Sequence, residues 1–307
     1  MKPNRLKTIL NLVAILCTTT FFAQEYSFKT YDWNEKETKV EIPEKYKNEN
    51  EVILDRTEKI ELVIVEKTAK QYHLIHEKIF INSDDAIERN NKIYIPFSLD
   101  ESVLVNKARV ILKNGNVISK DQKDIKEDVD QEKGMKYNYF AVNGLEKGAV
   151  IEKLYVLEEG PEFTGQTIKM QDEYPIANLN FELIYPNYLI FKTKSYNKLS
   201  EPTIDEKKIE NKTVLSVIEK NIPGLDDNEQ YSNWALQLKL FRYKLDENQL
   251  SGGINLNNFK EFSTNIYARL NPELDKKQQK SLDDFCATIP KSKDLQEQIW
   301  NIENQIK

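Results

Sequence analysis

Residues 60–81 have the sequence IELVIVEKTAKQYHLIHEKIFI, which sets the pattern for most of the chain. Between residues 60 and 67 apolar side chains occupy both alternating sets of positions, as is typical of a strand that is covered on both faces. Residues 72–81 continue with β-branched and aromatic side chains in the same period of two. Two long strands are therefore expected here.

The same alternation predicts strands along most of the chain before Gly252. The segment 234–240, with Trp234 at its start, is expected to be a strand, with a helix as the alternative. Asn114-Gly115 is expected to form a two-residue hairpin turn, because glycine and asparagine adopt positive φ at low cost. The remaining expected strands are 92–97, 103–112, 117–118, 137–142, 149–157, 168–170, 179–185, 189–196 and 214–218.

Two polar stretches, 119–134 and 200–212, are expected to be solvent-exposed loops. The first contains several acidic residues, which raises a cation-binding loop as an alternative. It lacks the turn glycine and the closing glutamate of a known calcium loop, and its lysines offset the negative field. The loop interpretation is therefore preferred.

The pattern changes after Gly252-Gly253, where apolar residues recur at spacings of three and four. Helices are expected at 258–270, between Pro272 and Pro290, and at 294–306. Strands followed by helices predict a mainly β protein, with an antiparallel β-sandwich body and a short C-terminal helical segment. The expected domains are a signal peptide at 1–23, the sandwich at 24–250 and the helical segment at 251–307.

The N-terminus has the features of a secretory signal peptide. Lys2, Arg5 and Lys7 precede an apolar run from residue 8 to 22, and Ala23 offers a cleavage site. An uncleaved anchor is the alternative, although the run is short for a membrane-spanning helix. A lipoprotein signal at Cys17 would need a small residue before it, and Leu16 is not small. We expect an exported protein, periplasmic or associated with the cell surface, that does not span the membrane after cleavage.

Composition limits the classes of partner and chemistry. The net charge is −6 and no basic stripe with interleaved aromatic residues is evident, so nucleic acid is not an expected partner. Removal of residues 1–23 would leave Cys286 as the one cysteine, which excludes an internal disulfide. None of the common nucleotide-binding or hydrolase motifs is present.

Few residues are candidates for chemistry. His73 and His76 are the two histidines, and their odd spacing on a strand would direct them to opposite faces, which disfavours a shared metal. Cys286 falls late in an expected helix beside two aspartates and is interpreted as a packing residue. Aromatic residues, Trp33, Trp234 and Trp300 among them, suggest a sugar-stacking face as an alternative to core packing. The sequence therefore assigns no catalytic, cofactor-binding or metal-binding residue.

Four segments together resemble a known family over about residues 50–215: VILKNGNVI (110–118), YFAVNGLEKGAVIE (139–152), MQDEYPI (170–176) and FELIYP (181–186). The family is the domain of unknown function that precedes transglutaminase-like domains in exported proteins of Gram-negative bacteria. The resemblance implies a β-sandwich module of unassigned role, and residues 258–306 resemble the opening helices of a transglutaminase-like domain. No position in this chain matches that domain's Cys, His and Asp, which would follow Lys307.

The sequence favours a non-catalytic exported module that binds or presents a ligand or partner for a transglutaminase-like domain or another exported protein. One alternative is a sandwich that binds carbohydrate or cell wall. A further alternative is a cysteine hydrolase that acts through Cys286.

Overall fold

The computed structural model describes residues 26–65, 68–98, 102–120, 124–130, 132, 135–142, 144–225 and 233–307. The expected signal peptide at 1–23 lies outside these ranges and stays a prediction. The chain divides into two compact units, Met1–Leu256 and Asn257–Lys307. Within the described ranges, no helix has both the length and the apolar character needed to cross a membrane.

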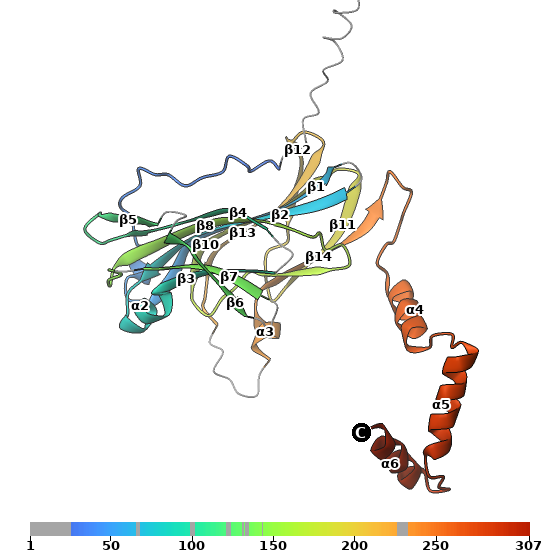
Figure 1. The fold of residues 1–307 in the computed structure, drawn as a ribbon. Coiled ribbons are helices and arrows are strands. Elements are labelled where there is room, and N and C mark those ends of the chain that lie inside the picture. The colour runs from blue at the N-terminus through green and yellow to red at the C-terminus, as the bar shows by residue number, and fades with distance from the viewer. Residues whose placement is uncertain are drawn as a thin grey trace, which may run out of the picture. The chain divides into compact units, whose positions relative to one another are not determined.

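The first unit, the body, is mainly β-structure (Figure 1). Its short helices are η1 (Glu44–Tyr46), α2 (Asp84–Asn90) and α3 (Trp234–Gln237). Its strands are β1 (Glu51–Val65), β2 (Thr68–Ile81), β3 (Lys92–Ser98), β4 (Ser102–Ile111), β5 (Val117–Lys120), β6 (Lys126–Asp130), β7 (Met135–Ala141), β8 (Ala149–Glu159), β9 (Gln166–Lys169), β10 (Ile176–Pro186), β11 (Leu189–Tyr196), β12 (Thr203–Ile209), β13 (Lys212–Ile222) and β14 (Leu240–Asn248).

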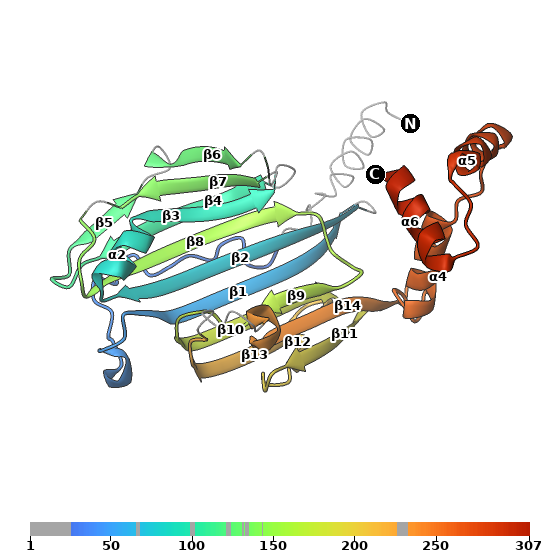
Figure 2. The same cartoon turned by 90° about the horizontal axis from the view of Figure 1, so that it is seen from below.

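The strands form three sheets. The large sheet has eight strands in the order β12-β13-β10-β1-β2-β8-β4-β5. The β14 sheet has the order β11-β14-β9, and the β7 sheet has the order β3-β7-β6. Figure 2 shows the two small sheets in front of opposite halves of the large one.

The expectation of purely antiparallel sheets is wrong at one position. β1 and β10 pair in parallel, with Ile60 opposite Leu183, whereas the other strand pairs are antiparallel. β1 therefore has an antiparallel neighbour, β2, on one side and a parallel neighbour on the other. Because parallel strands need a long crossover connection, local sequence alternation cannot reveal such a pair.

One core cluster joins all three sheets. Phe181 of the large sheet and Phe241 of the β14 sheet have ring centroids 5.3 Å apart, and both are fully buried. Ile93 and Phe140 of the β7 sheet belong to the same cluster. We call the face of the large sheet that carries this cluster its inner face.

The opposite face of the large sheet, its outer face, is covered by the N-terminal segment 26–43 (Figure 1). Ser27 donates hydrogen bonds from its backbone nitrogen and its hydroxyl to Glu61, at 2.7 and 2.6 Å. Lys212 pairs with the other oxygen of the same carboxylate, and both side chains are buried. Trp33 is also buried beneath the segment. The segment is therefore an integral part of the fold.

Most expected strands are present, but three expectations about local structure are wrong. The stretches 119–134 and 200–212, expected as loops, contain β6 and β12. Residues 234–240, expected as a strand, form α3 and then only the start of β14. In the β4–β5 hairpin only Gly115 has positive φ, at 87°, so the turn is not the two-residue type that was expected.

The second unit contains the three helices that the sequence predicts. They are α4 (Phe259–Leu270), α5 (Lys276–Thr288) and α6 (Leu295–Ile306). Asn258, Asp275 and Asp294 cap their N-termini by accepting hydrogen bonds from backbone N–H groups. None of the residues in these helices is buried.

Candidate functional site

His73 lies on the inner face of the large sheet, between two carboxylates. Its Nε2 is 2.9 Å from Oε1 of Glu58, and its Nδ1 is 3.6 Å from Oε1 of Glu159. Burial opposes protonation of the imidazole, but the hydrogen bonds and charges of Glu159 and Glu58 outweigh it and raise the pKa of His73 to about 10. His73 is therefore a cation at neutral pH.

His76 lies on the outer face, so the expected placement of the two histidines on opposite faces is confirmed. Its Nδ1 is 2.8 Å from the Tyr31 hydroxyl, and its Nε2 is 2.8 Å from Glu152. Glu152 also pairs with Arg109 at 2.5 Å, and both of these side chains are almost fully buried. The two histidines thus belong to separate polar clusters. Among the described residues, no group of three or more His, Cys, Asp or Glu side chains could hold a metal ion.

A pocket of about 450 Å³ lies beside His73, between the large sheet and β9. Arg56 pairs with Glu77 at 2.5 Å and with Asp172 at 2.8 Å, and Lys153 pairs with Glu77 at 2.7 Å. Burial raises the pKa of Glu77, but the charges of Arg56 and Lys153 dominate and lower it to about 2. The charges of Arg56, Glu77 and Lys153 therefore already have opposite partners within the cluster.

Cys286 lies in α5 and is exposed, so its expected role as a packing residue is wrong. The amphipathic pattern predicted the helix correctly, but no residue of this helix is buried. Residues 257–307 contain no histidine, so this unit supplies no imidazole to activate the thiol.

The tryptophans of the body do not form a shared stacking face. Trp33 is buried on the outer face of the large sheet, with the cations of Lys107 and Arg109 over its ring. Trp234 lies in α3, where its Nε1 donates a hydrogen bond to the carbonyl oxygen of Leu225 at 2.8 Å. Trp300 belongs to the other unit, where it is exposed on α6.

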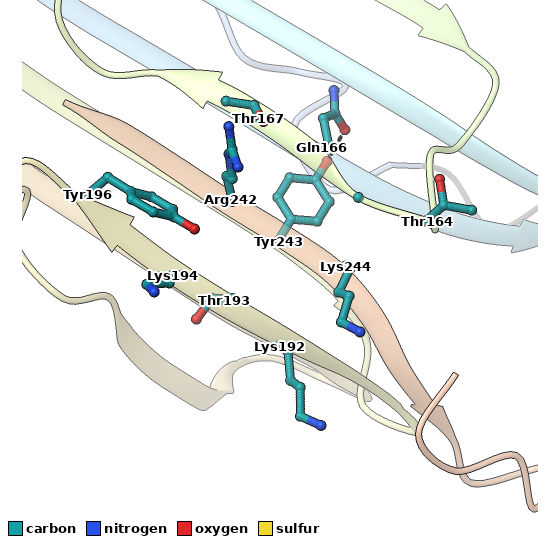
Figure 3. A pocket seen from close by; sticks show the side chains of 11 residues that line it. Thr164, Gln166, Thr167, Lys192, Thr193, Lys194, Tyr196, Arg242, Tyr243 and Lys244 are labelled. Atoms are coloured by element: carbon teal, nitrogen blue, oxygen red, sulfur yellow. Dashed lines mark hydrogen bonds between the residues drawn. The ribbon is translucent and has the colours of Figure 1, made fainter. Parts of the chain in front are cut away.

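A second pocket, of about 430 Å³, lies over the exposed face of the β14 sheet (Figure 3). Four basic side chains line it, Lys192 and Lys194 from β11 and Arg242 and Lys244 from β14, together with the ring of Tyr196. We call it the basic groove. Alternation along both strands explains the composition, because the residues between these basic ones, such as Tyr243, point toward the core.

The four cations form two directly opposed pairs. The register of β11 and β14 places Lys192 opposite Lys244 and Lys194 opposite Arg242. Like charges that face each other across two strands destabilise a sheet. The opposed cations therefore do not favour the pairing of β11 with β14.

The partners of the basic side chains differ across the groove. Lys192 pairs with the buried carboxylate of Asp246 at 2.8 Å. The Nζ atom of Lys194 and the guanidinium carbon of Arg242 lie 5.1 and 5.2 Å from the centroid of the Tyr196 ring. Within the part of the chain that the structure describes, neither Lys194 nor Arg242 has a carboxylate at ion-pair distance. The groove is thus a concentrated positive surface on an acidic chain.

Sequence reasoning missed this groove. The signal was present as Lys192-Thr193-Lys194-Ser195-Tyr196 and Arg242-Tyr243-Lys244, in which every second residue is basic or aromatic. Each segment alone is unremarkable, because lysine is common on exposed strands. Only the pairing of β11 with β14 brings the two segments together.

The fold is similar to that of a solved structure, although the sequences differ. A crystal structure of a protein from Parabacteroides distasonis ATCC 8503, named a putative protease, matches with a TM-score of 0.64 at 13% identity. The match covers 84% of this chain and 50% of the other, so this chain spans half the length of that protein. A putative nutrient binding protein from Legionella pneumophila matches at a TM-score of 0.34 and 9% identity, over 82% of this chain and 84% of the other.

At the level of sequence, no curated protein matches this chain. A family model does match at residues 67–225, about half of the chain, and overlaps most of the stretch at 50–215 in which the sequence resembles a domain of unknown function. That family is described as a domain of unknown function with a solved structure, DUF3857. The chain therefore belongs to the DUF3857 family.

Proposed function

We propose that this chain is a non-catalytic binding module and that the basic groove is where it holds an anionic ligand. The observation that carries the proposal is the strand register, which places Lys192 opposite Lys244 and Lys194 opposite Arg242. Among the described residues, Lys194 and Arg242 have no carboxylate at ion-pair distance, so they add positive potential to this surface, and an anion that enters it is attracted to both cations.

The environments of the two histidines support binding rather than catalysis in the body. His73 is a cation clamped between Glu58 and Glu159, which leaves it poorly suited to accept a proton at neutral pH. His76 is held between Tyr31 and Glu152 on the other face. A cysteine hydrolase that uses Cys286 would need an imidazole from outside its own unit.

We propose further that the body is a β-sandwich, since one core cluster is filled from all three sheets. In this proposal the module is exported and serves a transglutaminase-like domain, as the family resemblance implies. The similarity to a longer protein named a putative protease is in keeping with this arrangement, but it shows the fold alone.

The proposal predicts that binding and stability respond in opposite directions to one substitution. Lys194→Glu replaces a like-charge contact with Arg242 by an opposite-charge contact, so the variant should be as stable as the parent or more stable, by up to about 1 kcal/mol. Binding of inorganic triphosphate, measured by titration calorimetry at low salt, should weaken at least tenfold.

Lys220→Glu is the matched control. Lys220 is exposed on β13 of the large sheet and faces Asn178, so the same change in net charge occurs away from the groove. It should leave triphosphate binding unchanged. Equal losses in the two variants, or no binding by the parent protein, would refute the groove as an anion site. Peptide cleavage or isopeptide-bond formation by the purified chain would refute the non-catalytic role.

A further inference from the structure

The side chains that line the basic groove indicate the class of ligand that it binds. Besides the basic side chains, the outward-facing part of the lining includes the hydroxyl of Thr167, which lies opposite Arg242, and the lining includes no aliphatic side chain. Stable protein–protein contacts usually centre on buried apolar and aromatic anchors. The groove has no aliphatic side chain in its lining and Tyr243 is buried, so it suits a ligand that is itself covered with polar groups.

The arrangement of the cations indicates a ligand with more than one negative group. Successive residues on one face of a strand are about 7 Å apart, and directly opposed residues on neighbouring strands are about 5 Å apart. Lys192, Lys194, Arg242 and Lys244 therefore form a patch of two rows. A single small anion would engage only part of that patch.

The state of Tyr196 argues against single-stranded nucleic acid. Such strands bind largely by stacking their bases on open aromatic rings. The ring of Tyr196 is already accompanied by the cations of Lys194 and Arg242, at 5.1 and 5.2 Å from its centroid. Tyr243, the other aromatic residue of the lining, is 2% exposed, and its hydroxyl bonds to Gln166. Tyr243 therefore offers no stacking platform, and a base stacked on Tyr196 would share that ring with two cations.

We propose that the ligand of the basic groove is an acidic oligosaccharide, a short chain of sugars that carry carboxylates. This inference rests on the proposed function and specifies its ligand. The sugar carboxylates pair with Lys194 and Arg242, while the sugar hydroxyls exchange hydrogen bonds with Thr167. Arginine suits this task because its planar fork matches a carboxylate with two parallel hydrogen bonds.

The experiment compares four probes by titration calorimetry at 50 mM salt with the full chain. The probes are tetragalacturonate, the neutral galactose tetramer, tetraglutamate and a tetrathymidylate. We expect tetragalacturonate to bind at least tenfold more tightly than each of the other three. Lys194→Glu should weaken it at least tenfold, whereas Lys220→Glu should leave it unchanged.

Thr167→Val separates sugar recognition from simple charge attraction. Thr167 is exposed on β9, so its loss should not disturb the core. The variant should bind tetragalacturonate three- to tenfold more weakly and inorganic triphosphate as well as the parent does.

The outcomes distinguish this inference from the proposed function. Tighter binding of tetraglutamate or tetrathymidylate than of tetragalacturonate would overturn the glycan inference and leave the anion-binding function standing. Equal binding of the neutral tetramer would also overturn it. Failure of every anion, triphosphate included, would end both proposals.

Discussion

Replacing His73 with glutamine should destabilise the body strongly, because it removes the cation that lies between Glu58 and Glu159. The three side chains are only 15%, 8% and 15% exposed. A rise of the pKa from 6.5 to about 10, at about 1.4 kcal/mol per pKa unit, sets an upper limit of about 5 kcal/mol. Removing one partner of a buried ion pair typically lowers the free energy of unfolding by about 3–5 kcal/mol. We expect the free energy of unfolding of His73→Gln to be about 3 kcal/mol lower than that of the parent.

Urea unfolding followed by tryptophan fluorescence at pH 7 measures this loss. The triple variant His73→Gln, Glu58→Gln, Glu159→Gln removes both carboxylate charges as well, so it should recover at least half of the lost stability. If the triple variant is no more stable than the single one, the loss does not come from uncompensated charge.

The pH dependence gives an independent check with a definite sign. The pKa of His73 is higher in the folded protein than in the unfolded chain. The contribution of protonated His73 to the free energy of unfolding is therefore fully present below about pH 6.5 and is lost as the pH rises toward about 10. The stability difference between the parent and His73→Gln should therefore shrink steadily from pH 6.5 to 9.5. A difference that stays constant over this range, or is below about 1 kcal/mol at pH 7, would refute the reasoning.

Three further predictions test other parts of the structure. Gly224→Ala should lower the stability by about 2 kcal/mol or more, because the added Cβ would lie 2.3 Å from a backbone carbonyl oxygen. Gly160→Ala adds a Cβ in open space and should be neutral in the same urea titration. Arg109→Leu should cost about 3 kcal/mol because the buried carboxylate of Glu152 loses its ion pair with Arg109 and keeps only the weaker contacts with His76 and Lys78. Adding Glu152→Leu should restore part of the loss, which a thermal melt would show. Cys286 is exposed, so it should react fully with iodoacetamide in the native protein, and mass spectrometry would reveal an unmodified thiol if it is shielded.

Much of the fold could be predicted because burial leaves a clear pattern. β2 and β8 are rich in β-branched and aromatic residues and are largely buried, and strands at these places follow from sequence alone. β12 was missed because nearly all of its residues are exposed, and pairing with β13 holds it in place. α3 was missed for a different reason, since a four-residue turn carries too little periodicity to separate it from a strand.

The surroundings of the two histidines and the basic groove differ in how far the sequence could predict them. The spacing of His73 and His76 predicted their opposite faces, because it depends only on local strand geometry. Their carboxylate partners, which lie on β1 and β8, could not be predicted, since strand order decides which residues meet. The basic groove depends on Lys194 meeting Arg242, which is distant in the sequence, through the register of two strands.

The parallel pairing of β1 with β10 has a consequence for synthesis of the chain. β2 follows β1 directly, so this hairpin can form early, but the other edge of β1 stays open until Ile176–Pro186 has emerged. At about 5–20 residues per second, more than a hundred residues of delay correspond to roughly 5–20 seconds on the ribosome. During that interval an apolar strand edge is available to wrong partners, which predicts that a nascent chain halted before residue 176 aggregates or recruits a chaperone.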